Sequence, residues 1–145
     1  MHVATNYKDV FDHANDAIFI HDEQTGAILD ANRMASNLTG FSVEQLRQMR
    51  VGDISARHRG CDDSGAVAWL QRAIHEGPQL FEWWLCRPDG SDVPIEVNLK
   101  HIISDGNPRV ISLVRDIRER KEAEQRLVAR EAHYRRLIGS ISDGI

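Results

Sequence analysis

The chain has 145 residues and a mass of 16.5 kDa, which fits one globular domain and excludes a large multidomain enzyme. Its residues are 41% hydrophobic and 28% charged, as in folded proteins, which excludes a wholly disordered or collagen-like chain. The net charge of -4 argues against a nucleic-acid-binding protein, because phosphate contacts need a basic surface.

Helix and strand signals alternate in the first part of the chain. Residues 7–14 are predicted to form a short helix with its apolar side chains on one side. Strand-forming residues at 17–22 and 27–30, joined by a Thr-Gly turn, predict a hairpin. Asn32 is a good N-cap for a helix over residues 33–38, because its side chain can accept hydrogen bonds from free amides of the first turn.

A second short helix is predicted after Gly40, which ends the first one. Ser42 and Gln45 have the spacing of a capping box, so this helix is expected to run to about residue 49. Residues 51–63 are predicted to be an irregular and polar segment, with Cys61 inside it.

One long helix and three strands are predicted in the second half. Apolar residues at helical spacing predict the helix over residues 64–76, and a Gly-Pro pair ends it. Alternating apolar residues predict strands over residues 80–87, 93–103 and 109–116, and the Asp-Gly turns between them are typical of hairpins. We therefore expect an α+β domain with one antiparallel sheet and its helices on one side.

The alternation assigns side chains to the two faces of this sheet. The face toward the helices carries the candidate ligand-pocket residues, which are Phe19, His21, Trp83, Leu85, Ile95, Val97, Ser112 and Val114. Two interpretations are open. These residues form either a cavity in which His21 and Ser112 orient a small molecule, or a filled core in which the Ser112 hydroxyl bonds to the backbone. The other face carries an apolar strip of Trp84, Ile111 and Leu113, which a second copy of the chain or the N-terminal helix is expected to cover.

A basic helical segment follows the last strand. Residues 115–136 carry eight Lys/Arg and five Asp/Glu, a net charge of +3, which leaves -7 for the remainder of the chain. Positions that include Ala123 and Leu127 recur at the period of about 3.5 residues that is typical of a coiled coil, and Arg130 interrupts the apolar seam. The segment is therefore either a parallel dimeric connector or a solvated, monomeric linker helix.

Four segments of the chain are similar to motifs of PAS domains with their C-terminal PAC half. They lie at residues 11–18, 31–41, 81–91 and 114–121, in the order and spacing of that family. The resemblance implies a five-stranded antiparallel sheet wrapped by short helices, with a small cavity between them. It also implies a sensory module that responds to a ligand, cofactor or partner, often as a homodimer, and passes its state to an output domain.

The resemblance includes the exit from the sheet, where Asp116 and Ile117 match the family's Asp-Ile-Thr motif and Arg118 replaces the threonine. The candidate relay residues are Asp116, Ile117, Ala123 and Leu127. A sensor histidine kinase is the favoured output, and a diguanylate cyclase or phosphodiesterase is the alternative. The rival function is a ligand-free module for protein interaction and dimerisation.

An internal match divides the chain. Residues 7–18 align without gaps on residues 134–145, so the chain is expected to hold one repeat and the start of the next. The expected parts are an N-terminal helical segment (1–16), a sensor domain (17–116), a charged connector helix (117–138) and a truncated second repeat (134–145). The chain would then belong to a longer, tandem protein.

No enzyme or metal-binding motif occurs in the sequence, so neither a catalytic nor a metal site is expected, and any ligand or cofactor is unidentified. The Asn-Cys-Arg motif of light-sensing relatives is missing, which argues against a flavin. His75 lies near the axial position of haem-binding relatives, but a histidine at a helix end commonly serves the helix dipole. No apolar run reaches the ~18 residues of a membrane span, and two cysteines without nearby partners favour a reducing, cytoplasmic location.

Overall fold

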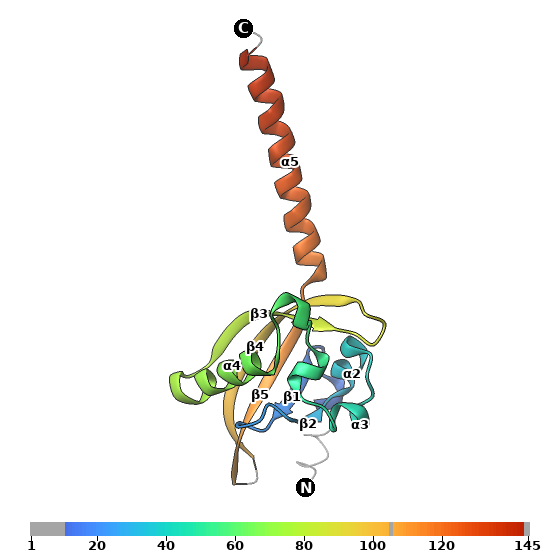
Figure 1. Ribbon diagram of the computed structural model, residues 1–145, viewed down its shortest axis with the longest axis vertical. Coiled ribbons are helices and arrows are strands. Elements are labelled where there is room, and N and C mark those ends of the chain that lie inside the picture. The colour runs from blue at the N-terminus through green and yellow to red at the C-terminus, as the bar shows by residue number, and fades with distance from the viewer. Residues whose placement is uncertain (1–10, 105, 144–145) are drawn as a thin grey trace.

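A five-stranded antiparallel sheet forms one layer of the computed structural model, which describes residues 11–104 and 106–143 (Figure 1). The strands are β1 (Ala17–His21), β2 (Ile28–Ala31), β3 (Gln79–Cys86), β4 (Asp92–Ser104) and β5 (Asn107–Asp116). Their order across the sheet is β2-β1-β5-β4-β3, so strands from the two ends of the chain meet at its centre. The predicted α+β class and the single antiparallel sheet are confirmed.

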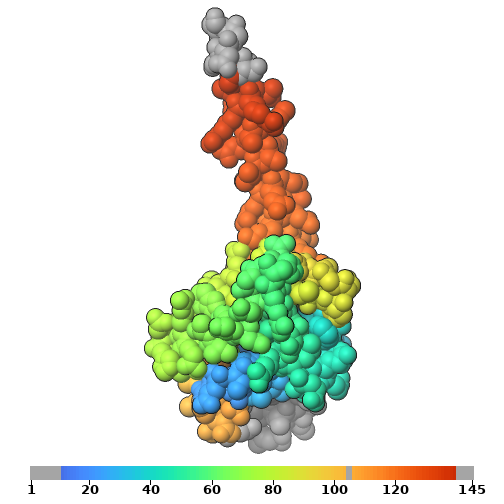
Figure 2. Space-filling model, in the orientation of Figure 1, coloured from blue at the N-terminus to red at the C-terminus, as the bar shows by residue number. Residues whose placement is uncertain are grey.

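Helices cover one face of this sheet (Figure 1). They are α2 (Arg33–Thr39), α3 (Val43–Leu46) and α4 (Asp63–Glu76), with the short 3-10 turns η1 (Val51–Ile54) and η2 (Arg57–Arg59) between α3 and α4. The last helix, α5 (Arg118–Asp143), projects away from the globular body (Figure 2). Of the N-terminal helix predicted over residues 7–14, residues 7–10 lie outside the described residues, and 11–13 are helical.

The predicted helix ends are set by local hydrogen bonds. Asn32 caps α2, and Gly40 ends it in the left-handed conformation at a φ of 82°, which glycine adopts without a steric penalty. The Ser42–Gln45 capping box is present, with Ser42 N–H donating to Gln45 Oε1 at 2.8 Å. Helix α3 nevertheless ends at Leu46, before the predicted residue 49, because the amides of Gln48 and Met49 bond three residues back in 3-10 geometry.

The segment between α3 and α4 differs from the prediction. Residues 51–63 were expected to be irregular and polar, but Ile54, Ala56 and Cys61 are buried. The segment is held on the edge of the sheet, where the Ala56 amide donates to the carbonyl oxygen of Trp84 at 2.9 Å. Its apolar side chains are thereby placed over the inner face of the sheet, where they help to close the core.

Candidate functional site: a central cavity and the helix junction

A small cavity lies between the inner face of the sheet and the α4 side of the domain. Its volume is about 50 Å³. All eight residues predicted from strand alternation line it: Phe19, His21, Trp83, Leu85, Ile95, Val97, Ser112 and Val114. The structure thus brings these side chains together around one space, and their role in binding a ligand stays a prediction.

The helical wall of the cavity was not predicted. It is formed by Val51, Ile54, Ala66, Trp69 and Leu70. Trp69 stacks on Phe81 with ring centres 4.0 Å apart, and this contact joins α4 to β3. Ala66 and Leu70 are one helical turn apart, and this spacing could have predicted from the sequence that they share the buried side of the helix. Val51 and Ile54 could not be predicted in this way, because the burial of their segment depends on tertiary contacts.

Two polar side chains face each other within this apolar wall. The Nε2 atom of His21 lies 2.8 Å from the hydroxyl oxygen of Ser112, on the neighbouring strand β5. The other ring nitrogen of His21, Nδ1, is buried without a hydrogen-bond partner among the residues the structure describes. Burial lowers the pKa of the His21 imidazole to about 4, because the charged ring would lose its hydration, so the ring is neutral at pH 7.

A haem contact through His75, which the sequence did not favour, has no geometric support. His75 lies exposed on α4, bonded to Gln71 through Nε2 at 3.2 Å, and it is not among the cavity-lining residues. Within the described ranges there is no cluster of side chains suited to hold a metal ion. In the same part of the chain, no helix combines the length and apolarity needed to span a membrane.

The start of α5 is fixed to the end of the sheet. Ile117 is buried, and its amide donates to the carbonyl oxygen of Pro94 on β4 at 3.1 Å. Asp116 accepts a hydrogen bond from the Arg118 amide at 2.9 Å and pairs with the Arg118 guanidinium at 2.6 Å. Arg118, which replaces the family's threonine, therefore makes both a backbone and a side-chain contact to Asp116.

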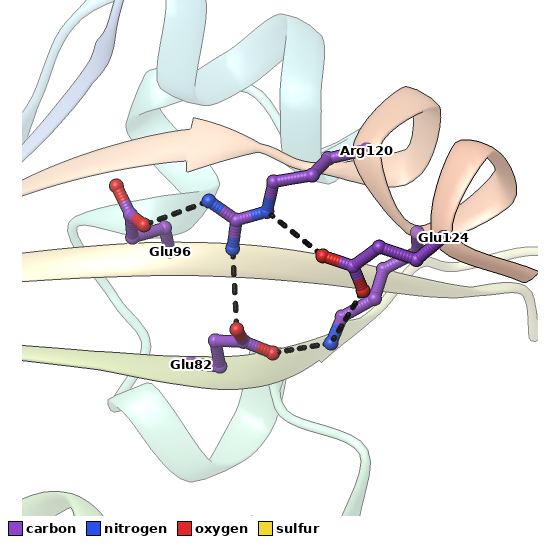
Figure 3. Close-up of polar contacts among 5 residues, drawn as sticks. Glu82, Glu96, Arg120 and Glu124 are labelled. Atoms are coloured by element: carbon purple, nitrogen blue, oxygen red, sulfur yellow. Dashed lines mark hydrogen bonds and ion pairs between the residues drawn. The ribbon is translucent and has the colours of Figure 1, made fainter. Parts of the chain in front are cut away.

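The first turn of α5 is also tied to the outer face of the sheet by ion pairs (Figure 3). Arg120 bonds Glu96 at 3.0 Å and Glu82 at 3.2 Å, and Lys121 reaches Glu82 at 2.6 Å. Glu82 and Glu96 lie directly opposite each other on β3 and β4, where like charges would repel. The two cations of α5 offset this repulsion, and the Lys121 hydrogen bond lowers the pKa of the Glu82 carboxyl.

Comparison with known proteins assigns the fold. The sequence profile of the PAS domain family matches residues 15–119. This chain belongs to the PAS family. A solved domain of the sensory box sensor histidine kinase/response regulator from Geobacter sulfurreducens is similar to this PAS domain, with a TM-score of 0.65 and 27% identity. The match covers 78% of this chain and 93% of that domain, which confirms the predicted PAS fold.

Two relatives place the PAS domain in signalling proteins. The methyl sulfide methyltransferase-associated sensor of Methanosarcina acetivorans is 28% identical over 118 residues, which are 81% of this chain and 12% of the relative. Sporulation kinase E of Bacillus subtilis is 28% identical over 140 residues, 96% of this chain and 18% of the kinase. The chain thus spans less than a fifth of either relative, and it is a sensory domain with homologues in sensor histidine kinases.

The outer face of the PAS sheet carries two apolar patches where one strip was predicted. Ile111 and Leu113 are half-buried on β5, whereas Trp84 lies two strands away on β3, under the Arg59 guanidinium at 3.7 Å. Strand β4 separates them and presents polar side chains such as Lys100, the register partner of Ile111. Residues 1–10 of the N-terminal segment lie outside the described residues, so a cover over these patches stays a prediction.

The candidate relay residues divide into two groups. Asp116 and Ile117 form the junction with the sheet, as described above. Ala123 and Leu127 lie beyond it on the exposed part of α5, where the Leu127 side chain is 65% exposed. Only the first group is therefore in contact with the PAS body.

Proposed function

We propose that this PAS domain senses a small molecule in its central cavity and relays the occupied state through α5 to an output domain. The main support for the proposal is that β3 and β4, which line the cavity, also hold the glutamates that pair with Arg120 and Lys121 of α5. Glu82 lies between the lining residues Phe81 and Trp83, and Glu96 lies between Ile95 and Val97.

Strand geometry supplies the path of the relay. Successive side chains of a strand point to opposite faces, so a molecule pressing on the inner side chains of β3 and β4 displaces the outer glutamates as well. Arg120 and Lys121 follow those carboxylates because they are paired with them. The first turn of α5 thereby moves with the wall of the cavity, and a rigid helix carries that movement along its length.

Xenon provides a test of the relay, because it occupies small apolar cavities without a chemical requirement. In amide NMR spectra, xenon pressure is expected to shift the signals of cavity residues and of residues 117–121 together. In Arg120→Ala the cavity signals should still shift, whereas the α5 signals should respond much less. Arg130→Ala, an exposed position farther along the same helix, is the matched control and should behave as the unmodified protein.

Other responses would contradict the proposal. A cavity that takes up xenon without any response at residues 117–121 would remove the relay. A cavity that takes up neither xenon nor any small molecule would favour the rival function, a ligand-free module for protein interaction and dimerisation.

The proposed output is a sensor histidine kinase, and the kinase relatives support this choice. A diguanylate cyclase or phosphodiesterase is the alternative output, since a PAS domain followed by a charged helix suits either. We place the domain in the cytoplasm, where Cys61 and Cys86, both free, would stay reduced.

A homodimer through α5 is the proposed assembly. The helix is exposed from residue 122 to residue 139, and the large apolar side chains exposed there are Leu127, Val128, Tyr134, Leu137 and Ile138. A lone solvated helix gains little stability from its own hydrogen bonds, so pairing these side chains with a second copy would stabilise it.

The dimer is expected to appear in sedimentation or light-scattering measurements at high protein concentration. Leu127→Glu should weaken it, because it places like charges in the paired seam. Glu131→Gln, at an exposed position of the same helix outside the predicted seam, is the control. A monomer at all concentrations would exclude this assembly for the isolated chain.

A further inference from the structure

Three side chains belong both to the wall of the cavity and to the surface of the domain. Twelve of the fifteen residues that line the cavity are buried, and only Val51, Trp69 and Phe81 are half-buried. Because protein interiors are close-packed, a molecule can enter only where side chains of the wall move aside. The smallest movement is needed where these side chains already reach the solvent, so the path into the cavity is expected at one of these three residues.

Trp69 and Phe81 meet at a junction that side chains alone close. Trp69 lies on α4, and Phe81 lies on β3, which is an edge strand of the sheet. Their rings stack with centres 4.0 Å apart and planes 7° from parallel. Among the residues that the structure describes, no hydrogen bond or ion pair joins α4 to β3. Rotation of the two side chains can therefore open this junction without breaking a hydrogen bond.

Val51 lies in a part of the wall that hydrogen bonds hold in place. Its amide donates to the carbonyl oxygen of Gly26 at 3.2 Å, and its own carbonyl oxygen accepts from the Ser55 hydroxyl at 2.6 Å. The Ala56 amide then fixes the segment to Trp84 on β3. The short, branched side chain of Val51 has little freedom to move by itself, so opening the wall here requires the backbone to move and these bonds to break. The junction between α4 and β3 is thus the less costly path.

The neighbours of the stacked pair show which ring is free to move. Trp83 meets Phe81 edge-on at 6.0 Å and is itself fixed, because its indole N–H donates to Ser55 at 2.9 Å. The Trp69 side chain makes no hydrogen bond within the described part of the chain. Besides Phe81, its ring contact is with the exposed Arg72, whose guanidinium carbon lies 4.7 Å from the ring centre. Trp69 is therefore the more mobile member of the pair.

We propose that small molecules enter and leave the cavity between α4 and β3, and that Trp69 and Phe81 form a gate that controls their passage. The gate opens when the Trp69 ring turns away from Phe81, and Arg72 helps to hold it closed. The inference rests on the proposed function and names the residues that set how fast the same cavity fills and empties.

Xenon exchange measured by saturation transfer in xenon NMR tests the gate, and Arg72→Ala is the most selective variant because Arg72 does not line the cavity. Loss of its contact with the Trp69 ring is expected to speed xenon entry and exit about two- to fivefold and to leave the dissociation constant unchanged. Arg72→Lys keeps a cation and should restore most of the slower exchange. His75→Leu, another exposed position of α4, is the matched control and should exchange xenon as the unmodified protein does.

A second variant removes the stacked ring itself. Trp69→Leu is expected to exchange xenon about tenfold faster, because the contacts with Phe81 and Arg72 are both lost. Val51→Ala, at the rival path, should have a smaller effect. Faster exchange in Val51→Ala than in Trp69→Leu would overturn the gate, and so would unchanged exchange in Arg72→Ala and Trp69→Leu or xenon uptake by none of these proteins. If Trp69→Leu does not fold, the surface variant Arg72→Ala still decides the test.

The outcomes distinguish this inference from the proposed function. Xenon coupled to α5, with an exchange rate that does not depend on Trp69 or Arg72, would overturn the gate and leave the relay intact. Faster exchange in both variants, with no response of α5 to xenon, would overturn the relay and leave the gate intact.

Discussion

Replacing Asn32 by Asp is expected to destabilise the domain by about 3–4 kcal/mol, although Asp and Asn are equally good N-caps for a helix. The Asn32 side chain is fully buried and makes four hydrogen bonds. Its oxygen accepts from the amides of Ile18 and Ala35, and its NH₂ group donates to the carbonyl oxygens of Phe11 and Asp16. Every donor and acceptor of the amide is used.

An aspartate would keep the two accepted bonds and lose the two donated ones. A carboxylate oxygen would then face two carbonyl oxygens in a site that is buried from solvent, where their repulsion is weakly screened. Urea denaturation of the Asn32→Asp variant measures the loss, with Asn37→Asp, at an exposed position of the same helix, as the control. A loss below about 1 kcal/mol would mean that Asn32 is only a helix cap.

Acidification from pH 6.5 to pH 4 is expected to remove about 3 kcal/mol of stability through His21 alone. The pKa of this histidine is lowered from 6.5 to about 4 in the folded protein by burial. Between these two values the unfolded chain binds a proton that the folded chain does not bind. The free energy of unfolding therefore falls as the pH falls through this window, and the contribution is fully present above pH 6.5.

The His21→Leu variant isolates this effect. The free energy of unfolding of both proteins is measured from pH 7.5 to pH 4, and carboxylates that titrate in both cancel in the difference. The difference between the two proteins should change by about 3 kcal/mol across the window, whereas His75→Leu should follow the unmodified protein. A difference that does not depend on pH would show that the His21 ring is not held neutral by burial.

Local sequence patterns predicted most of the helices and strands, and they predicted the residues of the sheet that line the cavity. Ser42 and Gln45 cap each other three residues apart, and strand alternation placed Trp83 and Ser112 on the same inner face. Both signals act over a few residues, so they can be recognised without knowing where distant segments lie. Burial of Ile54 could not be recognised in this way, because only its position over the sheet removes it from water.

By itself the sequence determined the N-caps of α2 and α3, the two faces of the strands, the antiparallel sheet and the PAS resemblance. The tertiary structure alone decided that the inner face leaves a cavity, that His21 pairs with Ser112 beside it, and that Arg120 joins Glu82 to Glu96. The reason is physical, since these features depend on distances between groups far apart in the chain. His21 and Ser112 are 91 residues apart, and Arg120 and Glu82 are 38 apart, so the folded sheet brings each pair within reach.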